Sequence, residues 1–333
     1  MSRRPSDRDT RASHDRPLLR RFPALASIPR VSLGEYPTPI ESLESLAPGL
    51  WIKRDDLSGA TMGGNKTRAL EFLLGDVTAG TRLVTVGSAG STHALAVATH
   101  GERLGADVRI ARWRQEMNPS ADRVARKLSS MNNPSPVFRT PLGAYWWAMR
   151  QRMRGARWIA AGGSTALGVL GHVNAGLELI DQIHAGAFPQ PAAVVVPLGT
   201  GGTAAGLALA FAIAACPITV IGARVVSRVV ARKSRVRHLA GLTAALIERM
   251  TGDLVPSVRS DRIDIEHSTW AGAYGRDTAG AREAALRLQN ATGVELDATY
   301  SAKAFELALG LTHAARGPTL YWLTFDSRIL DAP

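Results

Sequence analysis

The sequence predicts an α/β protein with two domains and mostly parallel, twisted sheets covered by helices. Between about residues 80 and 250, short apolar runs alternate with longer segments of helical apolar spacing. Glycine turns join the runs to the helices, as at 87–90 and 199–202, which is typical of repeated strand-turn-helix units. The chain has 333 residues, 45% of them hydrophobic, enough for a sizeable core.

The first clear unit begins with the apolar run 82–88, which we expect to be a buried strand. It continues through the turn 89–92 into a helix over 93–105, which a glycine ends. The other elements expected in this half are, in order, a strand at 107–113, helices at 124–131 and 144–155, a strand that runs into a glycine turn over 157–164, and a helix at 171–186.

A second clear unit follows, in which the strand of "AAVVVPLGTGG" (192–202) leads through glycines into an apolar helix over 203–215. The pattern then predicts a strand at 218–226 and a helix at 238–250. The basic residues between them, from Arg228 to Arg237, are expected to form a solvated helix start.

Charge and cysteine content exclude several classes of protein. The net charge is +12, but eight arginines and three aspartates give residues 1–30 a charge of +5, and the other arginines are scattered. We expect residues 1–18 to be a disordered basic tail, and we expect no nucleic-acid or membrane partner. Cys216 is the single cysteine, which excludes an internal disulfide and a cysteine zinc cluster. We expect no metal site. We do expect a reducing, cytoplasmic location.

The turn Gly199–Thr203 is the first candidate ligand site. In parallel sheets, ligands bind at the carboxyl ends of strands, where glycine turns and helix N-termini present free amides to anions. We therefore expect this turn to bind a phosphate, with Thr200 and Thr203 as hydroxyl donors. The same residues fit a loose dinucleotide fingerprint, but the acidic ribose ligand is missing, and Arg224 and Arg228 would suit only a 2′-phosphate.

Two further segments have the same character. In "GSAGSTH" (87–93), Ser91, Thr92 and the start of a helix could bind a carboxylate, although a close-packed turn capped by serine explains the segment equally well. In "GGNKTRALEFL" (63–73), Lys66 falls in the first turn of a helix, where a cation opposes the helix dipole. That position is poor for stability but favours the neutral amine needed to bond a carbonyl carbon; a solvent-exposed lysine is the alternative.

Taken together, these segments resemble the fold type II pyridoxal-phosphate enzymes, the tryptophan synthase β-like family. The nearest branch is that of 1-aminocyclopropane-1-carboxylate deaminase and D-cysteine desulfhydrase. The resemblance runs from about residue 32 to 328 and rests on the order and spacing of the motifs, which include "YPTPIESL", "LWIKRDDLSG", "GGNKTRALEFLL", "GSAGSTHALA", "GGSTALGVLGHVNAGLEL" and "VVPLGTGGTAAGL". It implies a large cofactor-binding domain from 19–67 and 176–333, a small domain from 68–175, and a homodimer.

The resemblance also implies residue roles. Lys66 would carry pyridoxal 5′-phosphate covalently and move the α-proton of the substrate. The residues implied to bind the phosphate are Gly199, Thr200, Gly201, Gly202 and Thr203. Ser91, Thr92 and His93 would face the substrate, with Asn65 and Thr92 also at the cofactor. The family usually has asparagine at the position of Thr92, hydrogen-bonded to the cofactor's phenolic oxygen; the threonine of this chain is shorter.

The C-terminal motifs bear on the reaction. "WAGAYG" (270–275) and "LDATYSAKAF" (296–305) resemble segments whose tyrosines reach the substrate, which nominates Tyr274 and Tyr300; core tyrosines are the alternative. Ser301 would face the pyridine nitrogen, where the deaminases have glutamate, and Thr324 would be a second hydroxyl there. Two hydroxyl groups would leave the ring nitrogen largely neutral, which makes the ring a weaker electron sink. "FDSR" (325–328) replaces a glycine pair of the desulfhydrases.

The sequence therefore predicts a pyridoxal-phosphate lyase that removes a β-substituent from a small amino acid, as D-cysteine desulfhydrase does, and yields keto acid and ammonia. Cyclopropane-carboxylate deamination is the first alternative, and a racemase or β-replacement enzyme on the same scaffold is another. From other classes, an NADP-binding oxidoreductase and a catalytically idle cofactor-binding protein remain open.

Overall fold

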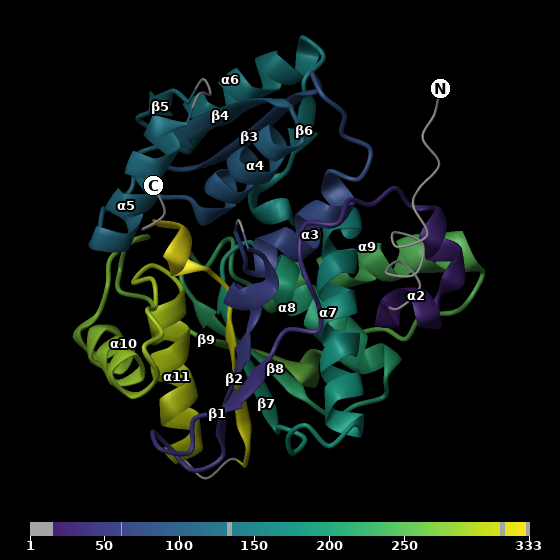
Figure 1. The fold of residues 1–333 in the computed structure, drawn as a ribbon, viewed down its shortest axis with the longest axis vertical. Helices are drawn as coiled ribbons and strands as arrows, with labels where there is room; N and C mark the ends of the chain where they lie inside the picture. Colours follow the sequence, from purple (N-terminus) through teal and green to yellow (C-terminus); the bar gives the residue numbers. More distant parts are fainter. Residues whose placement is uncertain (1–15, 61, 132–134, 314–316, 331–333) are drawn as a thin grey trace.

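Two sheets organise the chain in the computed structural model, which describes residues 16–60, 62–131, 135–313 and 317–330 (Figure 1). The larger sheet has the strand order β1-β2-β10-β7-β8-β9. Its strands are β1 (Ile40–Ser42), β2 (Leu50–Arg54), β10 (Thr319–Leu323), β7 (Ala193–Leu198), β8 (Thr219–Arg224) and β9 (Ile263–Glu266). Neighbours are parallel except for the antiparallel pair β1 and β2.

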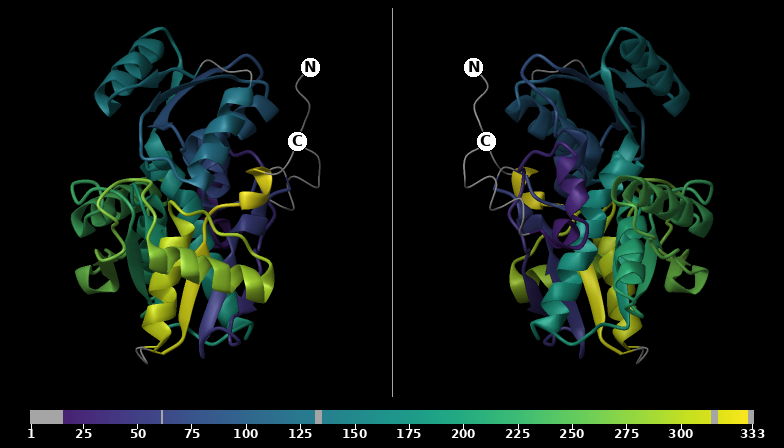
Figure 2. Two further views of the ribbon diagram at one scale, coloured as in Figure 1. Left: turned by 90° about the vertical axis from the view of Figure 1, so that its left-hand side faces the viewer. Right: turned by 90° about the vertical axis from the view of Figure 1, so that its right-hand side faces the viewer.

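The smaller sheet has the order β5-β4-β3-β6, and all its neighbours are parallel. Its strands are β5 (Val137–Phe138), β4 (Asp107–Trp113), β3 (Arg82–Ser88) and β6 (Arg157–Ile159). The two sheets occupy opposite ends of the molecule, with helices over their faces (Figures 1 and 2). The predicted fold class, parallel sheets covered by helices, is confirmed.

The longer helices follow the strands as the sequence predicts, with shifted ends. They are α3 (Asn65–Leu73), α4 (Thr92–Arg103), α5 (Pro119–Ser130), α6 (Pro141–Met153), α7 (Ala166–His184), α8 (Gly202–Ile213), α9 (Lys233–Thr251), α10 (Ala279–Thr292) and α11 (Ser301–His313). Helix α5 begins earlier than expected because Asn118 caps it, accepting a hydrogen bond from the Ala121 amide. The strand expected at 157–164 ends at Ile159, since Gly162 and Gly163 adopt positive φ.

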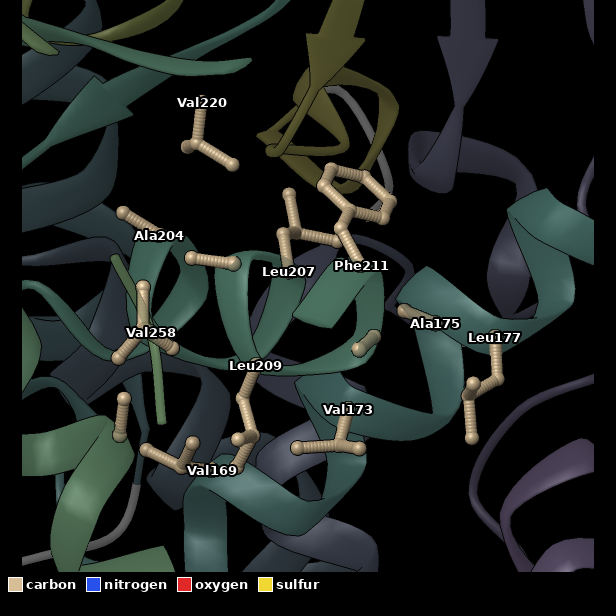
Figure 3. Packing of buried hydrophobic residues seen from close by; sticks show 14 of the residues in the cluster. Val169, Val173, Ala175, Leu177, Ala204, Leu207, Leu209, Phe211, Val220 and Val258 are labelled. Atoms are coloured by element: carbon tan, nitrogen blue, oxygen red, sulfur yellow. The ribbon is translucent and has the colours of Figure 1, made fainter. Parts of the chain in front are cut away.

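The core of the larger sheet has two faces, as the alternation of β7 requires. Val194 and Val196 pack with the apolar faces of α7 and α8, which include Val173 and Leu207 (Figure 3). Val195, between them, points to the opposite face, where α10 and α11 cover the sheet. This arrangement fixes the carboxyl ends of the strands and the loops that follow them.

Near the N-terminus, the sequence predicts a disordered tail for residues 1–18, of which residues 1–15 lie outside the described residues. Pro17 and Leu18 belong to helix α2 (Pro17–Arg21), where Leu18 is fully buried against the core. Among the described residues, no helix has the length and apolar character needed to cross a membrane.

Candidate active site

A cavity of about 700 Å³ opens where loops of the two sheets meet, and it brings together nearly all the predicted site residues. The predicted residues that line it are Asn65, Lys66, Ser91, Thr92, His93, Gly199, Thr200, Gly201, Gly202, Thr203, Tyr274, Tyr300 and Thr324. Ser301 is the exception: it lies behind this surface at the start of α11 and is fully buried.

Lys66 reaches the cavity from the first turn of α3. Gly64 precedes the helix with φ +97°, and a Cβ there would lie 2.4 Å from the carbonyl oxygen of Thr324. The same oxygen accepts a hydrogen bond from the Asn65 amide at 3.0 Å, so the segment after β10 braces the turn that positions Lys66. Burial lowers the pKa of the Lys66 amine to about 8, although the carboxylate of Asp297 opposes the shift. Burial thus raises the fraction of neutral amine, in the direction that the position of Lys66 at the helix start predicted.

The glycine loop between β7 and α8 is tied to the lysine helix. Asn65 donates from Nδ2 to Oγ1 of Thr203 at 2.7 Å, and Nε of Arg235 donates to the carbonyl oxygen of Thr200 at 2.9 Å. The hydroxyl groups of Ser164 and Thr200 are 2.6 Å apart. A Cβ on Gly199 would meet no atom within 4 Å, which leaves the backbone open to a ligand at the N-terminus of α8.

The loop after β3 holds Ser91, Thr92 and His93 at the start of α4. Ser91 caps the helix, since its Oγ accepts a hydrogen bond from the Ala94 amide at 3.2 Å. The capping that the sequence offered as an alternative is therefore present, and the Ser91 hydroxyl proton remains available to the cavity. Burial, followed by the nearby Lys66, lowers the pKa of His93 to about 3, so this ring is neutral at pH 7.

Tyr274 and Tyr300 come from separate C-terminal segments, and their hydroxyl groups contact each other at the cavity wall. Their rings meet edge to face, with centroids 5.9 Å apart. Burial raises the pKa of Tyr274 above its ordinary value, against a hydrogen bond with Ser88 that lowers it. Both residues are partly accessible from the cavity, unlike core tyrosines, and Tyr274 therefore stays a neutral hydroxyl donor.

Asp297 is a site residue that the sequence did not reveal. It lies at the start of α11, where its carboxylate accepts hydrogen bonds from the amides of Tyr300 (2.7 Å) and Ser301 (3.1 Å). Burial raises the pKa of Asp297 to about 6, while hydrogen bonds from the α11 start lower it. Its spacing of four residues before Ser301, ahead of an apolar helix, is the helix-cap signal that could have identified it.

A buried ionic cluster lies beneath α3. Arg68 donates to Asp55 at 2.7 Å and to Glu178 at 2.8 Å, and Lys53 donates to Glu178 at 2.6 Å. Burial alone would raise the pKa of Glu178, but Arg68 and Lys53 lower it to about 2. Arg68 lies two residues after Lys66, so the cluster fixes the helix that carries the lysine.

This set of residues fits pyridoxal phosphate. The open glycine turn suits a phosphate, and the half-buried Lys66, whose pKa is lowered, suits an aldehyde carbon. Thr324 lines the cavity and offers a hydroxyl group to a ring there, whereas the Ser301 Oγ is buried behind the wall beside Asp297, whose pKa a hydrogen bond with the Ser301 side chain lowers. Among the described residues, no group of three or more histidine, cysteine or acidic side chains could hold a metal ion.

Comparisons with known proteins agree with this fit. The family model described as pyridoxal-phosphate dependent enzyme matches residues 31–320. Nocardicin C-9′ epimerase of Nocardia uniformis subsp. tsuyamanensis is 34% identical over 91% of this chain and 94% of its own length. D-cysteine desulfhydrase of Salmonella typhi is 30% identical over 84% of this chain and 87% of its own. A solved structure of an ACC deaminase homologue superposes with a TM-score of 0.78 at 27% identity, covering 94% of this chain and 95% of that one.

Proposed function

The chain belongs to the family of pyridoxal-phosphate-dependent enzymes, and we propose that it is a lyase that eliminates a β-substituent from an amino acid, yielding a keto acid and ammonia. Lys66 carries the cofactor, the loop Gly199–Thr203 binds its phosphate, and Asn65, Thr92, Ser301 and Thr324 contact the remainder. The relative named D-cysteine desulfhydrase supports this assignment. The family match also leaves the NADP-binding alternative without support.

When bound, the cofactor draws off the electron pair left by the broken Cα–H bond. The chain's own residues bind the substrate and transfer the protons. Ser91, Thr92 and His93 hold the substrate carboxylate at the N-terminus of α4. The Nζ atom of Lys66 accepts the α-proton in its uncharged form, which burial makes more accessible by lowering the pKa to about 8. Tyr274, a neutral hydroxyl donor, is placed with Tyr300 to protonate the departing group.

The choice of elimination rests on the two residues that the resemblance implies at the ring nitrogen. Ser301 and Thr324 carry hydroxyl groups in place of a carboxylate, and the buried carboxylate of Asp297 accepts hydrogen bonds from the amides of Tyr300 and Ser301. A ring nitrogen without a carboxylate partner is less protonated and withdraws electrons less strongly. Expulsion of a good leaving group requires less electron withdrawal by the ring than opening an unactivated cyclopropane does.

Epimerisation is a second candidate, favoured by the relative named as an epimerase, which is 34% identical. It shares the removal of the α-proton but returns a proton to the opposite face of Cα. The cavity offers Ser91 and the tyrosine pair as donors distinct from Lys66. A chain built for epimerisation would invert its substrate without releasing ammonia.

A panel of amino acids tests the two candidates together. D- and L-cysteine, D- and L-β-chloroalanine and 1-aminocyclopropane-1-carboxylate would be incubated with the purified holoenzyme in deuterated water. Ammonia, keto acid, α-deuterium and enantiomer ratio would be measured in each case. We expect keto acid from cysteine and β-chloroalanine, and none from the cyclopropane. Inversion without keto acid would replace elimination by epimerisation, and the absence of both keto acid and α-deuterium throughout would contradict both.

Other features remain proposals. We expect a homodimer in the cytoplasm, as the resemblance and the single Cys216 suggest. We also propose that residues 68–175, which contain the four-stranded sheet, form the small domain, and that 19–67 and 176–333 form the large one. Light scattering would measure the oligomeric state, and limited proteolysis would locate the domain boundaries.

A further inference from the structure

The cavity is larger than the proposed reaction requires. Pyridoxal phosphate and cysteine have together about 22 non-hydrogen atoms, which fill roughly 450 Å³ at ~20 Å³ per atom in a packed interior. The cavity encloses about 700 Å³. The difference would hold an additional ring, so the volume leaves room for a substrate that extends beyond a small amino acid.

The residues around this additional space are aromatic and apolar. We call Trp113, Tyr145, Trp270, Val226 and Val230 the aromatic rim; all five line the cavity. The rings of Trp113 and Tyr145 stack at 6.2 Å with an interplanar angle of 22°. Such surfaces bind aromatic groups by burying apolar area and by ring-to-ring contact.

The two sides of the rim come from different sheets. Trp113 ends β4, and Tyr145 lies on α6, over the four-stranded sheet. Trp270 follows β9 of the larger sheet, where the Thr269 hydroxyl donates to the carbonyl oxygen of Arg224 at 3.0 Å. The Arg224 guanidinium in turn lies 4.9 Å from the Trp270 ring centroid, which holds that side chain in place. A flat group between the sheets would therefore have aromatic partners on both sides.

The cavity lining also carries positive charge. Arg114 and Arg235 line the cavity, whereas the acidic Glu116 pairs with Arg276 at 2.6 Å. Burial raises the pKa of the Tyr145 hydroxyl, and Arg235 is close enough to lower it in part. These arginines would stabilise an aromatic group that departs with negative charge.

We propose that the substrate is a cysteine S-conjugate with an aromatic thiol as its leaving group, held between the two sides of the aromatic rim. This inference rests on the proposed elimination and names its substrate class. Aromatic thiolates are better leaving groups than hydrosulfide, which matches the weak electron sink that Ser301 and Thr324 imply.

The reaction balances without an oxidant or a reductant. The Cα–H and Cβ–S bonds break, a Cα=Cβ double bond forms, and sulfur departs with the bonding pair and takes up a proton. Water then supplies the keto oxygen as ammonia is released. The products of S-phenylcysteine are thiophenol, pyruvate and ammonium.

The test compares S-phenylcysteine with cysteine, both enantiomers of each, on the purified holoenzyme. We expect kcat/KM to be at least tenfold higher for the conjugate. Trp270→Ala and Tyr145→Ala should lower the ratio of the two kcat/KM values about tenfold, the effect of losing a ring contact. Val230→Trp, which fills the space, should lower it further. Trp146→Ala is the matched control: Trp146 neighbours Tyr145 on α6, but it is 62% exposed and lies against Arg150.

Binding gives a second readout that does not depend on turnover. 2-Amino-4-phenylbutanoate has a carbon in place of sulfur and cannot eliminate; its dissociation constant would be compared by calorimetry with that of 2-aminobutanoate. Tighter binding of the phenyl compound that Trp270→Ala abolishes supports the proposal. If cysteine is consumed while phenyl compounds neither bind nor react, the aromatic subsite is wrong and the lyase stands. If neither cysteine nor the conjugate releases keto acid, both are wrong.

Discussion

Asn65 donates a hydrogen bond from Nδ2 to Oγ1 of Thr203 at 2.7 Å, although the residues are 138 positions apart in the chain. The bond joins the start of α3, which carries Lys66, to the glycine loop before α8. A cofactor bound at its phosphate by this loop and at its aldehyde by Lys66 fits the site only if the loop and Lys66 are the right distance apart. Asn65 is therefore a residue that positions both ends of the site.

Replacing Asn65 by alanine should weaken cofactor binding about tenfold, which corresponds to ~1.4 kcal/mol for one lost buried hydrogen bond. Titration of the apoprotein with pyridoxal phosphate, followed by absorbance, measures the dissociation constant. Thr203→Ser keeps the hydroxyl and serves as the control. Equal affinities for Asn65→Ala and the wild type would show that the bond does not position the site.

Removing the negative charge of Asp297 should lower the pKa of Lys66 below its present value of about 8, because that carboxylate stabilises the ammonium form. The rate at which apoprotein recaptures cofactor, measured against pH, should follow the neutral amine. Its inflection should move to lower pH in Asp297→Asn. Asp277→Asn, whose carboxylate acts on Lys303, should leave the inflection in place; a shift in that variant instead would contradict the assignment.

The buried cluster predicts acid sensitivity. The folded-state pKa of Glu178, about 2, lies below its ordinary value, so its stabilisation is present above about pH 4.5 and disappears as the pH falls toward 2. The free energy of unfolding should fall by on the order of 3 kcal/mol across this range because of Glu178 alone. Urea unfolding of the apoprotein at a series of pH values measures the slope.

Glu178→Gln should make that slope smaller and cost about 3–5 kcal/mol at neutral pH, since Arg68 and Lys53 lose a buried partner. Asp181→Asn, on the same helix, is the matched control. Its partner Arg20 and Asp181 itself are both 47% exposed, so this change should cost less than about 1 kcal/mol. A similar cost for the two variants would rule out the cluster as a source of stability.

Tyr274→Phe should lower kcat by roughly two orders of magnitude, the usual contribution of a positioned proton donor. The Tyr300→Phe change should act similarly, and the double variant should lose less than the product of both effects because the hydroxyl groups are in contact. Steady-state kinetics on cysteine measures this, and kcat on β-chloroalanine should fall less, because chloride departs without a proton. Unchanged cofactor absorbance in each variant is the control, and additive losses would show that the tyrosines act separately.

Sequence patterns predicted what local spacing encodes. The glycines and threonines of 199–203, the lysine at 66 and the strands at 82–88 and 107–113 are each specified within a few residues, and the structure places them at one cavity or in the predicted sheet. The C-terminal Tyr274 and Tyr300 were recognised only by resemblance, because nothing near them in the chain indicates that their hydroxyl groups meet.

The remainder depends on contacts between distant segments. Glu178 is 110 residues from Arg68 and 125 from Lys53, and no periodicity links these charges. The sequence around Asp297 indicates only an ordinary helix cap. Its effect on the pKa of Lys66 follows from the fold, which brings the two side chains together. The aromatic rim likewise joins side chains from both sheets.

The most direct test of the account is to locate the cofactor on the chain. The purified holoenzyme would be reduced with borohydride, digested and analysed by mass spectrometry; the chain has only the lysines Lys53, Lys66, Lys127, Lys233 and Lys303, so assignment is unambiguous. We predict that the pyridoxyl mass lies on the Lys66 peptide and is lost in Lys66→Ala. A pyridoxyl mass on another lysine, or on none, would contradict the assignment of Lys66 and the mechanism derived from it.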